Sequence, residues 1–307
     1  MFRKNNQSYV RAVDGVSLTI EKGKAFVVAG ESGSGKTTLA RIILRAIEPD
    51  SGSIVFDGDD ITKYEGSKLK KFRTNVQMIH QDPYTSLDPR MRILDIVMEP
   101  LNIHNKSKSK QERIEEVLVS LEEVRLEPAT DIAEKFPNML SGGQRQRVSI
   151  ARSLVLKPKL ILADEPVSML DVSVRAEILE LMKNLKDRLK LSYLYITHDL
   201  STARYIGDEI GIMYAGKIVE AGPIEQVLLN PLHPYTQALL DAISEPEPQN
   251  LEKEKIIRIK HGETRDRPHT GCRFIHRCLY SMDICKSDPL LGGEEDNHYV
   301  SCFIYPV

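Results

Sequence analysis

Short apolar runs and longer amphipathic stretches alternate along the chain. Ala25–Ala29, Leu160–Ala163 and Ser192–Ile196 are largely apolar runs bounded by turn residues, which is typical of strands buried on both faces of a sheet. Between the last two, residues 174–189 have apolar side chains at helical spacing and predict an amphipathic helix. Strands that alternate with helices indicate an α/β protein with a mainly parallel core sheet.

Other segments predict antiparallel strands and a block of helices. Val13–Ile20 alternates apolar and polar residues, and Ile54–Phe56 precedes an Asp-Gly turn, so both are expected to form strands. Ile210–Tyr214 and Lys217–Glu220 flank an Ala-Gly pair and predict a hairpin. From about Ser86 to Leu140 the pattern is mostly helical. The sheet is therefore expected to carry additional antiparallel and helical parts.

Length and charge narrow the class of protein. The chain has 307 residues, enough for one large α/β domain with a smaller appendage. Its 42 Lys and Arg residues nearly balance its 44 Asp and Glu residues, whereas proteins that bind nucleic acid usually carry a basic surplus. No apolar stretch reaches the roughly 18 residues of a membrane-spanning helix, and no signal peptide is apparent. We expect a protein that binds no nucleic acid, forms no pore, and is cytosolic or peripheral to the inner side of a membrane.

A glycine-rich loop lies between a predicted strand and a predicted helix. Its sequence, Gly-Glu-Ser-Gly-Ser-Gly-Lys-Thr, matches the phosphate-binding P-loop, and the strand-loop-helix context makes a chance match improbable. Glycines let backbone N–H groups turn inward around a phosphate, and the helix presents its positive N-terminal end. Lys36 is expected to bridge the β- and γ-phosphates of ATP, and Thr37 to hold Mg²⁺. The candidate nucleotide-binding residues here are Gly30, Glu31, Ser32, Gly33, Ser34, Gly35, Lys36, Thr37 and Thr38.

Two predicted strands end in residues suited to catalysis. The apolar run at 160–163 ends in Asp164 and Glu165, the Walker B arrangement. Asp164 is placed to join the Mg²⁺ shell, and Glu165 to polarise the attacking water as general base. An acid pair alone can be an ordinary strand end, and a lone histidine such as His198 is more often structural. Because parallel strands present their carboxyl ends along one edge, His198 could reach the γ-phosphate.

Leu140-Ser141-Gly142-Gly143-Gln144 completes a set of motifs that resembles the ABC ATPases. The set also contains the P-loop, Gln81 in a Gln-Asp-Pro loop, the acid pair, Asp171 and His198, and it spans about residues 10 to 225. The resemblance implies a P-loop domain with a mainly parallel core sheet, an antiparallel β subdomain and a helical subdomain at about 86–150. It further implies that two subunits enclose two ATP molecules. Each ATP then contacts the P-loop of one subunit and the Ser141–Gln144 segment of the other.

The same resemblance assigns roles to individual residues. Gln81 would sense the γ-phosphate, join Thr37 and Asp164 at Mg²⁺, and couple the site to a membrane partner. His198 would be a switch residue, and Asp171 would touch the opposite subunit. Tyr9 is the candidate aromatic for stacking on adenine.

Two further segments are similar to the ATPase subunits of dipeptide and oligopeptide importers. These are residues 77–91, which contain Gln-Asp-Pro-Tyr and Leu-Asp-Pro-Arg, and Pro231–Thr236. The chain resembles the F-type subunit, which pairs with a D-type ATPase, binds two permease subunits at the cytoplasmic face, and serves an extracellular solute-binding protein indirectly. The resemblance implies a nucleotide-binding domain at 1–230 and an extension at 231–307. Peptide, oligosaccharide and nickel remain open as cargo, because this type of subunit does not contact cargo.

All four cysteines lie near the C-terminus: Cys272, Cys278, Cys285 and Cys302. Their spacing lacks the close pairs of zinc sites and the ferredoxin pattern, so zinc, an iron–sulfur cluster, disulfides and free thiols all stay open. Similarity to the peptide-importer tail implies a [4Fe–4S] cluster. The linker at Glu245–Gln249 predicts that this tail forms a module apart from the ATP site.

Three functions are compatible with a P-loop ATPase of this kind. The energising subunit of an importer fits every motif. A soluble ABC ATPase in translation or DNA repair usually has tandem cassettes or long coiled coils, and this sequence shows one cassette. A regulator that binds ATP without hydrolysing it is disfavoured, since Glu165 and His198 are both present.

Overall fold

The structure is a computed structural model that describes residues 11–104, 108–242, 259–260, 268, 270–294 and 297–305. The chain forms two compact units. The central unit comprises Thr19–Ala29 and Leu39–Ile210, and the terminal unit comprises Met1–Leu18, Gly30–Thr38 and Gly211–Val307. The P-loop therefore groups with the C-terminal part of the chain.

A parallel sheet forms the core of the central unit. Four strands lie side by side in the order β4 (Val76–Ile79), β5 (Leu160–Asp164), β6 (Ser192–Thr197) and β1 (Ala25–Ala29). All three neighbouring pairs are parallel. Every residue of β1, β5 and β6 is buried, as expected for strands covered on both faces. The prediction of three buried parallel strands is confirmed, and the carboxyl ends of these strands meet at one edge.

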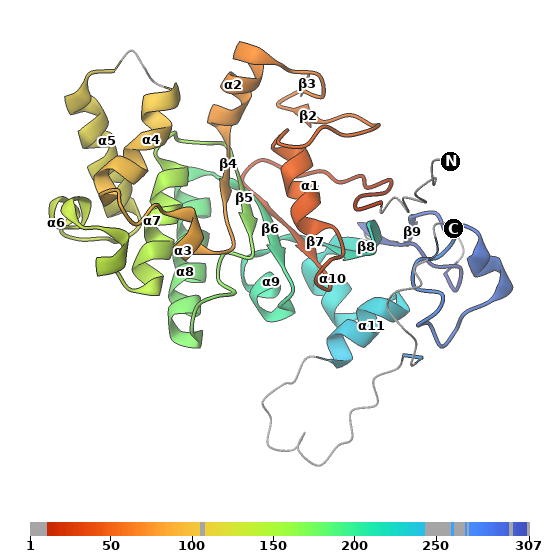
Figure 1. The fold of residues 1–307 in the computed structure, drawn as a ribbon. Helices are drawn as coiled ribbons and strands as arrows, with labels where there is room; N and C mark the ends of the chain where they lie inside the picture. Colours follow the sequence, from red (N-terminus) through yellow and green to blue (C-terminus); the bar gives the residue numbers. More distant parts are fainter. Residues whose placement is uncertain are drawn as a thin grey trace, which may run out of the picture. The chain divides into compact units, whose positions relative to one another are not determined.

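The helices of the central unit surround this sheet and extend from it (Figure 1). Helices α4 (Ile93–His104) to α7 (Gly142–Leu154) pack on one another through buried apolar side chains, as the mostly helical pattern from about Ser86 to Leu140 predicts. Asp57 and Gly58 take left-handed conformations in the turn between β2 and β3. The remaining elements are β2 (Val55–Phe56), β3 (Asp59–Asp60), α2 (Gly66–Asn75), α3 (Pro83–Ser86), α4 (Ile93–His104), α5 (Lys110–Glu123), α6 (Ala129–Glu134), η1 (Pro137–Met139), α7 (Gly142–Leu154), α8 (Val172–Leu189) and α9 (Leu200–Ile206).

The terminal unit is built on antiparallel strands. The tail strand β10 (His298–Val300) pairs with β8 (Lys217–Pro223) and with β9 (Gly292–Glu294). The predicted hairpin is present, with Ala215 and Gly216 in left-handed conformations between β7 and β8. The unit also contains β7 (Glu209–Tyr214, from Gly211 on), the start of α1 (Lys36–Ile43), α10 (Ile224–Leu229), α11 (Pro234–Asp241) and η3 (Asp283–Lys286).

A buried carboxylate joins three parts of the terminal unit. Glu220 in β8 has 0% exposed surface. It accepts hydrogen bonds from the backbone N–H groups of Leu232 and His233 at 2.8 and 2.9 Å, and it pairs with His298 Nε2 at 2.8 Å. A buried carboxylate without such donors would be strongly destabilising. His298 thus links the tail to β8.

A buried histidine begins helix α11. His233 Nδ1 accepts a hydrogen bond from Tyr235 N at 3.0 Å, so this nitrogen must carry no proton. Burial lowers the pKa of His233 to about 4, although nearby Glu220 acts in the opposite direction. The neutral form is therefore stable at neutral pH, and the helix start is fixed.

The expected strand at Val13–Ile20 does not form. Its alternating exposure is present, with Val16, Leu18 and Ile20 partly covered and their neighbours exposed. No ladder of backbone hydrogen bonds accompanies this pattern in the described residues, and Asp14 N donates to Gly216 O at 2.8 Å. Alternating apolar and polar residues indicate which side of a segment is covered. A strand forms only if a neighbouring strand also pairs with the segment.

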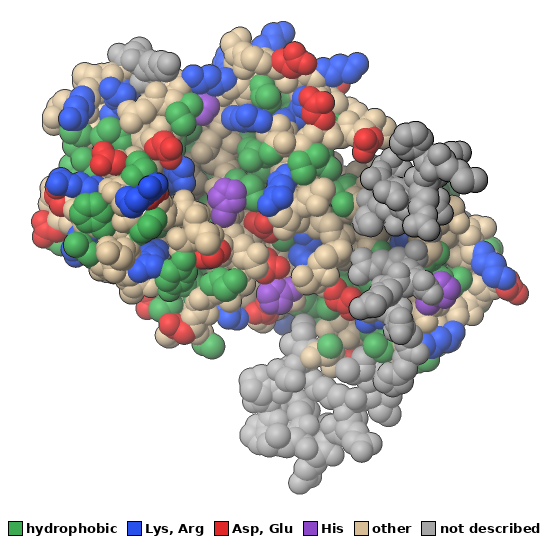
Figure 2. All heavy atoms as spheres, viewed as in Figure 1, with side chains coloured by type: hydrophobic (Ala, Val, Ile, Leu, Met, Phe, Trp, Pro, Cys, Tyr) green, Lys and Arg blue, Asp and Glu red, His purple; other side chains and the backbone are tan. Residues whose placement is uncertain are grey.

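Charged side chains of both signs are mixed on the surface. Figure 2 shows basic and acidic side chains interspersed over the described part of the face in view, as the near-neutral balance predicts. Within the described ranges, no helix is long and apolar enough to cross a membrane.

Candidate nucleotide site

The P-loop belongs to the terminal unit. Two of its positions must be glycine, because another segment of backbone lies close to each of them. Gly30 has φ +152°, and a Cβ there would lie 2.1 Å from Met213 O. Gly35 has φ +110°, and a Cβ there would lie 2.0 Å from Ala12 O. Any other residue would clash with backbone at both positions. The glycines thus permit a compact loop that leads into the N-terminus of α1, where backbone N–H groups favour an anion.

Lys36 is held inside this loop. Its side chain is almost fully buried, and its Nζ donates to Gly30 O at 2.8 Å and to Glu31 O at 3.0 Å. The loop thereby places a cation at its centre, where phosphate oxygens can replace the carbonyl acceptors. Thr37 and Thr38 follow in the first turn of α1 and are half-buried. Ser32 and Gly33 form the exposed tip, whereas Ser34 is buried.

The tail contacts the P-loop, which corrects the expectation of a separate module. Arg277 Nη1 donates to both carboxylate oxygens of Glu31 at 3.0 Å. Tyr235 Oη accepts a hydrogen bond from Glu31 N at 2.9 Å. A linker such as Glu245–Gln249 indicates a boundary along the sequence. It does not show whether the tail beyond it folds back onto the P-loop. That linker lies outside the described residues, as does Tyr9, the candidate for stacking on adenine.

In the central unit, the chain turns sharply after β5. Asp164 ends the strand and is 5% exposed. Glu165 follows with φ +46°, a left-handed conformation that costs a non-glycine residue free energy. Its N–H donates to Ile196 O at 2.9 Å, which ties the turn to the end of β6. The two acids therefore leave the strand from different backbone conformations, as separate roles in metal binding and base catalysis require.

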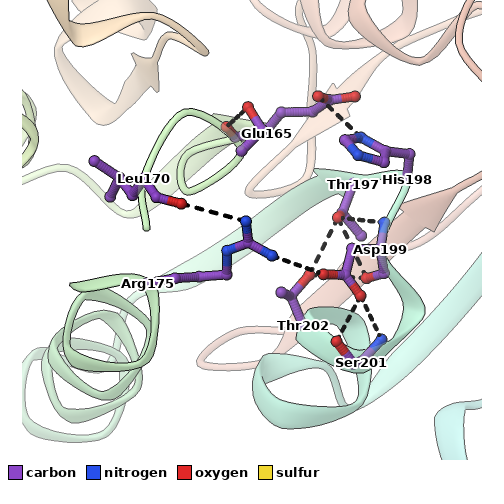
Figure 3. A network of polar contacts seen from close by, with 9 residues as sticks. Glu165, Leu170, Arg175, Thr197, His198, Asp199, Ser201 and Thr202 are labelled. Carbon is purple, nitrogen blue, oxygen red and sulfur yellow. Dashed lines mark hydrogen bonds and ion pairs between the residues drawn. The ribbon is translucent and has the colours of Figure 1, made fainter. Parts of the chain in front are cut away.

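Glu165 is the centre of a group of polar side chains formed at the ends of three strands. Gln81 Nε2 donates to Glu165 Oε2 at 2.8 Å. His198 Nδ1 lies 3.1 Å from the same oxygen (Figure 3). These residues follow β4, β5 and β6, which are adjacent and parallel. The Glu165 side chain is 13% exposed and that of His198 is 56% exposed. A carboxylate oriented by two neighbours and open on one side can accept a proton from a water molecule.

Residues beside His198 fix the turn that carries it (Figure 3). Asp199 caps α9 by accepting from Ser201 N at 2.9 Å. Arg175 reaches it from α8, with Nη1 3.2 Å from Asp199 Oδ2, while its Nη2 donates to Leu170 O at 3.3 Å. The segment before Asp171 is thus connected to the segment beside His198. No pattern in the sequence indicates this contact of Arg175, because an arginine on an amphipathic helix is ordinary.

The Ser-Gly-Gly-Gln segment begins helix α7 with a capping box. Ser141 Oγ accepts from Gln144 N at 3.3 Å, and Gln144 Oε1 accepts from Ser141 N at 3.1 Å. Ser141 therefore caps the N-terminus of α7. At Gly143, a Cβ would lie 2.5 Å from Val174 Cγ1, so α7 and α8 approach closely because this residue is glycine. A Cβ added at Gly142 would lie 3.0 Å from Tyr84 Oη, so the tyrosine side chain lies close to this glycine.

Asp171 has a local role in the structure. It precedes α8 and caps it, with Oδ1 accepting from Val174 N at 3.1 Å. Ser173 Oγ donates to the same oxygen at 3.2 Å. The contact with an opposite subunit that the family resemblance implies is a separate matter and stays a prediction.

Comparison with known proteins decides the family. The model of the ABC transporter family matches residues 13–168, which is more than half of the chain. A second model, the oligopeptide/dipeptide transporter C-terminal region, matches residues 219–285. This chain belongs to the ABC transporter family. It is an ABC ATP-binding protein, a class that hydrolyses ATP to power transport.

Curated relatives resemble this ABC ATPase over nearly their whole length. The oligopeptide transport ATP-binding protein AppF of Bacillus subtilis is 42% identical over 301 residues, covering 96% of this chain and 90% of AppF. The dipeptide transport ATP-binding protein DppF of Haemophilus influenzae is 42% identical over 304 residues, covering 99% and 91%. The oligopeptide transport ATP-binding protein OppF of Streptococcus mutans is 46% identical over 258 residues, covering 84% and 83%.

Solved structures confirm the ABC fold. The dimeric ATP-binding cassette MJ0796, in a post-hydrolysis state with ADP and Pi, is 31% identical to this ABC ATPase with a TM-score of 0.64. The match covers 72% of this chain and 94% of that one. CbiO1 from Clostridium perfringens, part of the transporter complex cbiONQ, is 28% identical with a TM-score of 0.64, covering 71% and 84%.

The four cysteines of this ABC ATPase line one apolar cavity in the terminal unit. Phe274, Ile275, Pro289 and other apolar residues complete its wall. Burial raises the pKa of Cys272 to about 11, and it also raises the pKa values of Cys278 and Cys302. Without a cation, these thiols are therefore protonated at neutral pH. Among the described residues, no group of three or more His, Cys, Asp or Glu side chains is placed to hold a metal ion.

Replacing Glu165 with Gln should reduce ATP hydrolysis at least ~100-fold, because it removes the general base while keeping the shape of the side chain. Binding of ATP, measured by isothermal titration, should be unchanged. A matched control is Glu180→Gln, which alters an exposed acid of the same unit. Near-normal turnover of the Glu165 variant in the assembled transporter would contradict the role given to Glu165.

Proposed function

We propose that this chain is the ATP-hydrolysing subunit that energises import of a small solute, a dipeptide or oligopeptide, through a membrane ABC transporter. The observation that carries the proposal is the contact of Gln81 and His198 with the Glu165 carboxylate. The three residues lie at the ends of three parallel strands. The names of the relatives, which are oligopeptide and dipeptide transport ATP-binding proteins, support a peptide over an oligosaccharide or nickel. One cassette and a transporter-type C-terminal region disfavour a soluble ABC ATPase of translation or repair.

Each motif has a part in hydrolysis under this proposal. The P-loop backbone and Lys36 bind the β- and γ-phosphates. Glu165 accepts the proton of the attacking water, while Gln81 and His198 orient the carboxylate and respond to the γ-phosphate. By the family resemblance, Thr37, Gln81 and Asp164 would supply hydroxyl, amide and carboxylate oxygens, the donors that suit Mg²⁺. The ion would neutralise charge on the phosphates.

The proposed subunit works as half of a pair. Ser141, Gly142, Gly143 and Gln144 start α7, so the positive end of that helix can face a partner's nucleotide. Asp171 would contact the partner near the same place. The dimeric state of the similar cassette MJ0796 supports such pairing. We expect the partner to be a D-type ATPase, giving a heterodimer.

The remaining partners follow from the family. Two permease subunits would hold the pair at the cytoplasmic face of the membrane, and an extracellular solute-binding protein would deliver cargo without touching this chain. In terms of function, residues 1–230 would be the nucleotide-binding domain and 231–307 the extension. The match of the C-terminal-region model to residues 219–285 supports that division.

The thiol cavity is proposed to hold a [4Fe–4S] cluster, with zinc as the alternative. Cys272, Cys278, Cys285 and Cys302 all reach one apolar cavity, and four thiolates are the usual ligands of such a cluster. A cluster or ion would stabilise the thiolate forms that burial disfavours. Its role would be structural, because a tail of this size has little apolar material of its own.

The isolated chain should hydrolyse ATP slowly, because its Ser141–Gln144 segment serves the nucleotide of a partner. Adding a D-type ATPase together with the permease subunits should raise the rate several-fold or more, measured as phosphate release at fixed ATP. Full activity of the purified monomer at high dilution would refute the paired site.

The content of the thiol cavity can be measured directly. Anaerobic purification followed by iron, sulfide and zinc analysis should give about four iron and four sulfide per chain, as expected of a [4Fe–4S] cluster. Cys278→Ser should lose the metal and lower the melting temperature of the tail. A colourless protein with stoichiometric zinc, or with neither metal, would overturn the cluster.

A further inference from the structure

The tail of this chain reaches the P-loop through one arginine. Arg277 immediately precedes Cys278, and its side chain is 15% exposed. Its Nη1 lies 3.0 Å from each carboxylate oxygen of Glu31, the second residue of the P-loop. The same nitrogen lies 3.5 Å from Tyr214 Oη. Glu31 and Arg277 are 246 positions apart in the sequence, so this pair is a tertiary contact of the terminal unit.

An aromatic cluster supports both partners. The rings of Tyr214 and Tyr235 are 4.5 Å apart, and the ring of Phe274 lies 5.3 and 5.5 Å from them. The Arg277 guanidinium lies 5.6 Å from the centre of the Phe274 ring and 5.8 Å from that of Tyr214, within the range of cation–π attraction. The guanidinium is thereby held in place by more than its ion pair.

Glu31 is fixed at two points by this cluster. Its carboxylate meets Arg277, and its backbone N–H donates to Tyr235 Oη at 2.9 Å. Tyr235 is buried in α11, directly after the capped helix start at His233. The second residue of the P-loop is therefore held by one residue of α11 and one residue of the tail.

The charge of Glu31 makes this arrangement important for phosphate binding. A carboxylate in a loop that must bind a polyphosphate opposes the anion by Coulomb repulsion. Arg277 cancels that charge at hydrogen-bond distance. Burial alone would lower the pKa of Arg277, but the hydrogen bonds to Glu31 and Tyr214 raise the pKa overall, so the guanidinium stays charged.

We propose that Arg277 is a positioning residue of the phosphate-binding loop, which neutralises Glu31 and, with Tyr235, fixes the loop for ATP. The inference rests on the nucleotide site proposed above. It makes an intact tail a requirement for full ATP affinity, and by linkage bound ATP stabilises the tail by the same free energy.

The thiol cavity is connected to the same residues. Cys278 N donates to Phe274 O at 3.0 Å, and Phe274 lines the cavity while packing on the aromatic cluster. A change at Cys278 therefore reaches Arg277 through one peptide bond and one buried ring. Cys278→Ser should weaken ATP binding, contrary to the expectation that a separate module would leave it intact.

The test is the ATP dissociation constant of the full chain, measured by isothermal titration at low salt. Arg277→Gln should weaken ATP binding about tenfold, because it leaves the Glu31 carboxylate uncompensated beside the phosphates. ADP, which carries less charge, should lose less. Arg277→Lys should lose less affinity than Arg277→Gln, since it keeps a cation there but gives up the contacts of the planar guanidinium. Lys286→Gln, which removes an exposed ion pair of the tail, is the matched control and should change nothing.

Charge compensation separates a positioning role from simple unfolding of the tail. Glu31→Gln in the Arg277→Gln background should restore ATP affinity to within about threefold of wild type, because the repulsive charge is gone. The loss in Arg277→Gln should also shrink at high salt. Failure of the second substitution to restore binding, or a loss independent of salt, would overturn the proposal.

A further variant separates this proposal from the site on which it rests. Lys36→Ala removes the cation at the centre of the loop, so it should weaken ATP binding whatever Arg277 does. If Lys36→Ala binds ATP normally, the nucleotide site itself is wrong. If Lys36→Ala loses affinity while Arg277→Gln does not, only the role of Arg277 is wrong.

Discussion

Parallel pairing of β4, β5 and β6 is the constraint on which catalysis depends. Parallel strands end at one edge, so the residues that follow them meet even though they are far apart in sequence. Gln81, Glu165 and His198 come together in this way. The left-handed turn at Glu165 adds local strain, which the hydrogen bond from Glu165 N to Ile196 O helps to hold. The sheet thus fixes the carboxylate before any nucleotide binds.

The P-loop depends on contacts of a different kind. Its glycines allow backbone to pass within van der Waals distance of Met213 and Ala12, while its charged side chains are held from elsewhere in the terminal unit. Lys36 is held by carbonyl groups of the loop itself, whereas Glu31 is held by Tyr235 and Arg277. Residues 30–38 and the C-terminal part of the chain therefore belong to one compact unit.

Local patterns predicted much of this structure from the sequence. The buried strands, the P-loop and the capping box at Ser141 depend on residues close together in the chain, so composition and spacing reveal them. The strand expected at Val13–Ile20 failed because strand formation needs a partner that alternation does not specify. The contacts of Arg175 and Arg277 join distant segments, and an arginine on a helix or in a tail carries no sign of its partner. The thiol cavity is predictable only in part. The sequence shows that the four cysteines lie near one another in the chain, but not that they line one cavity.

Gln81, Glu165 and His198 are expected to act as one catalytic unit. The test is the turnover number of the assembled transporter with Gln81→Ala, His198→Ala and both substitutions together. Residues that orient one carboxylate should show strongly non-additive losses, so the double variant should be little slower than the worse single variant. Losses that multiply in the double variant would show that the two residues act independently, and would contradict this account of the site.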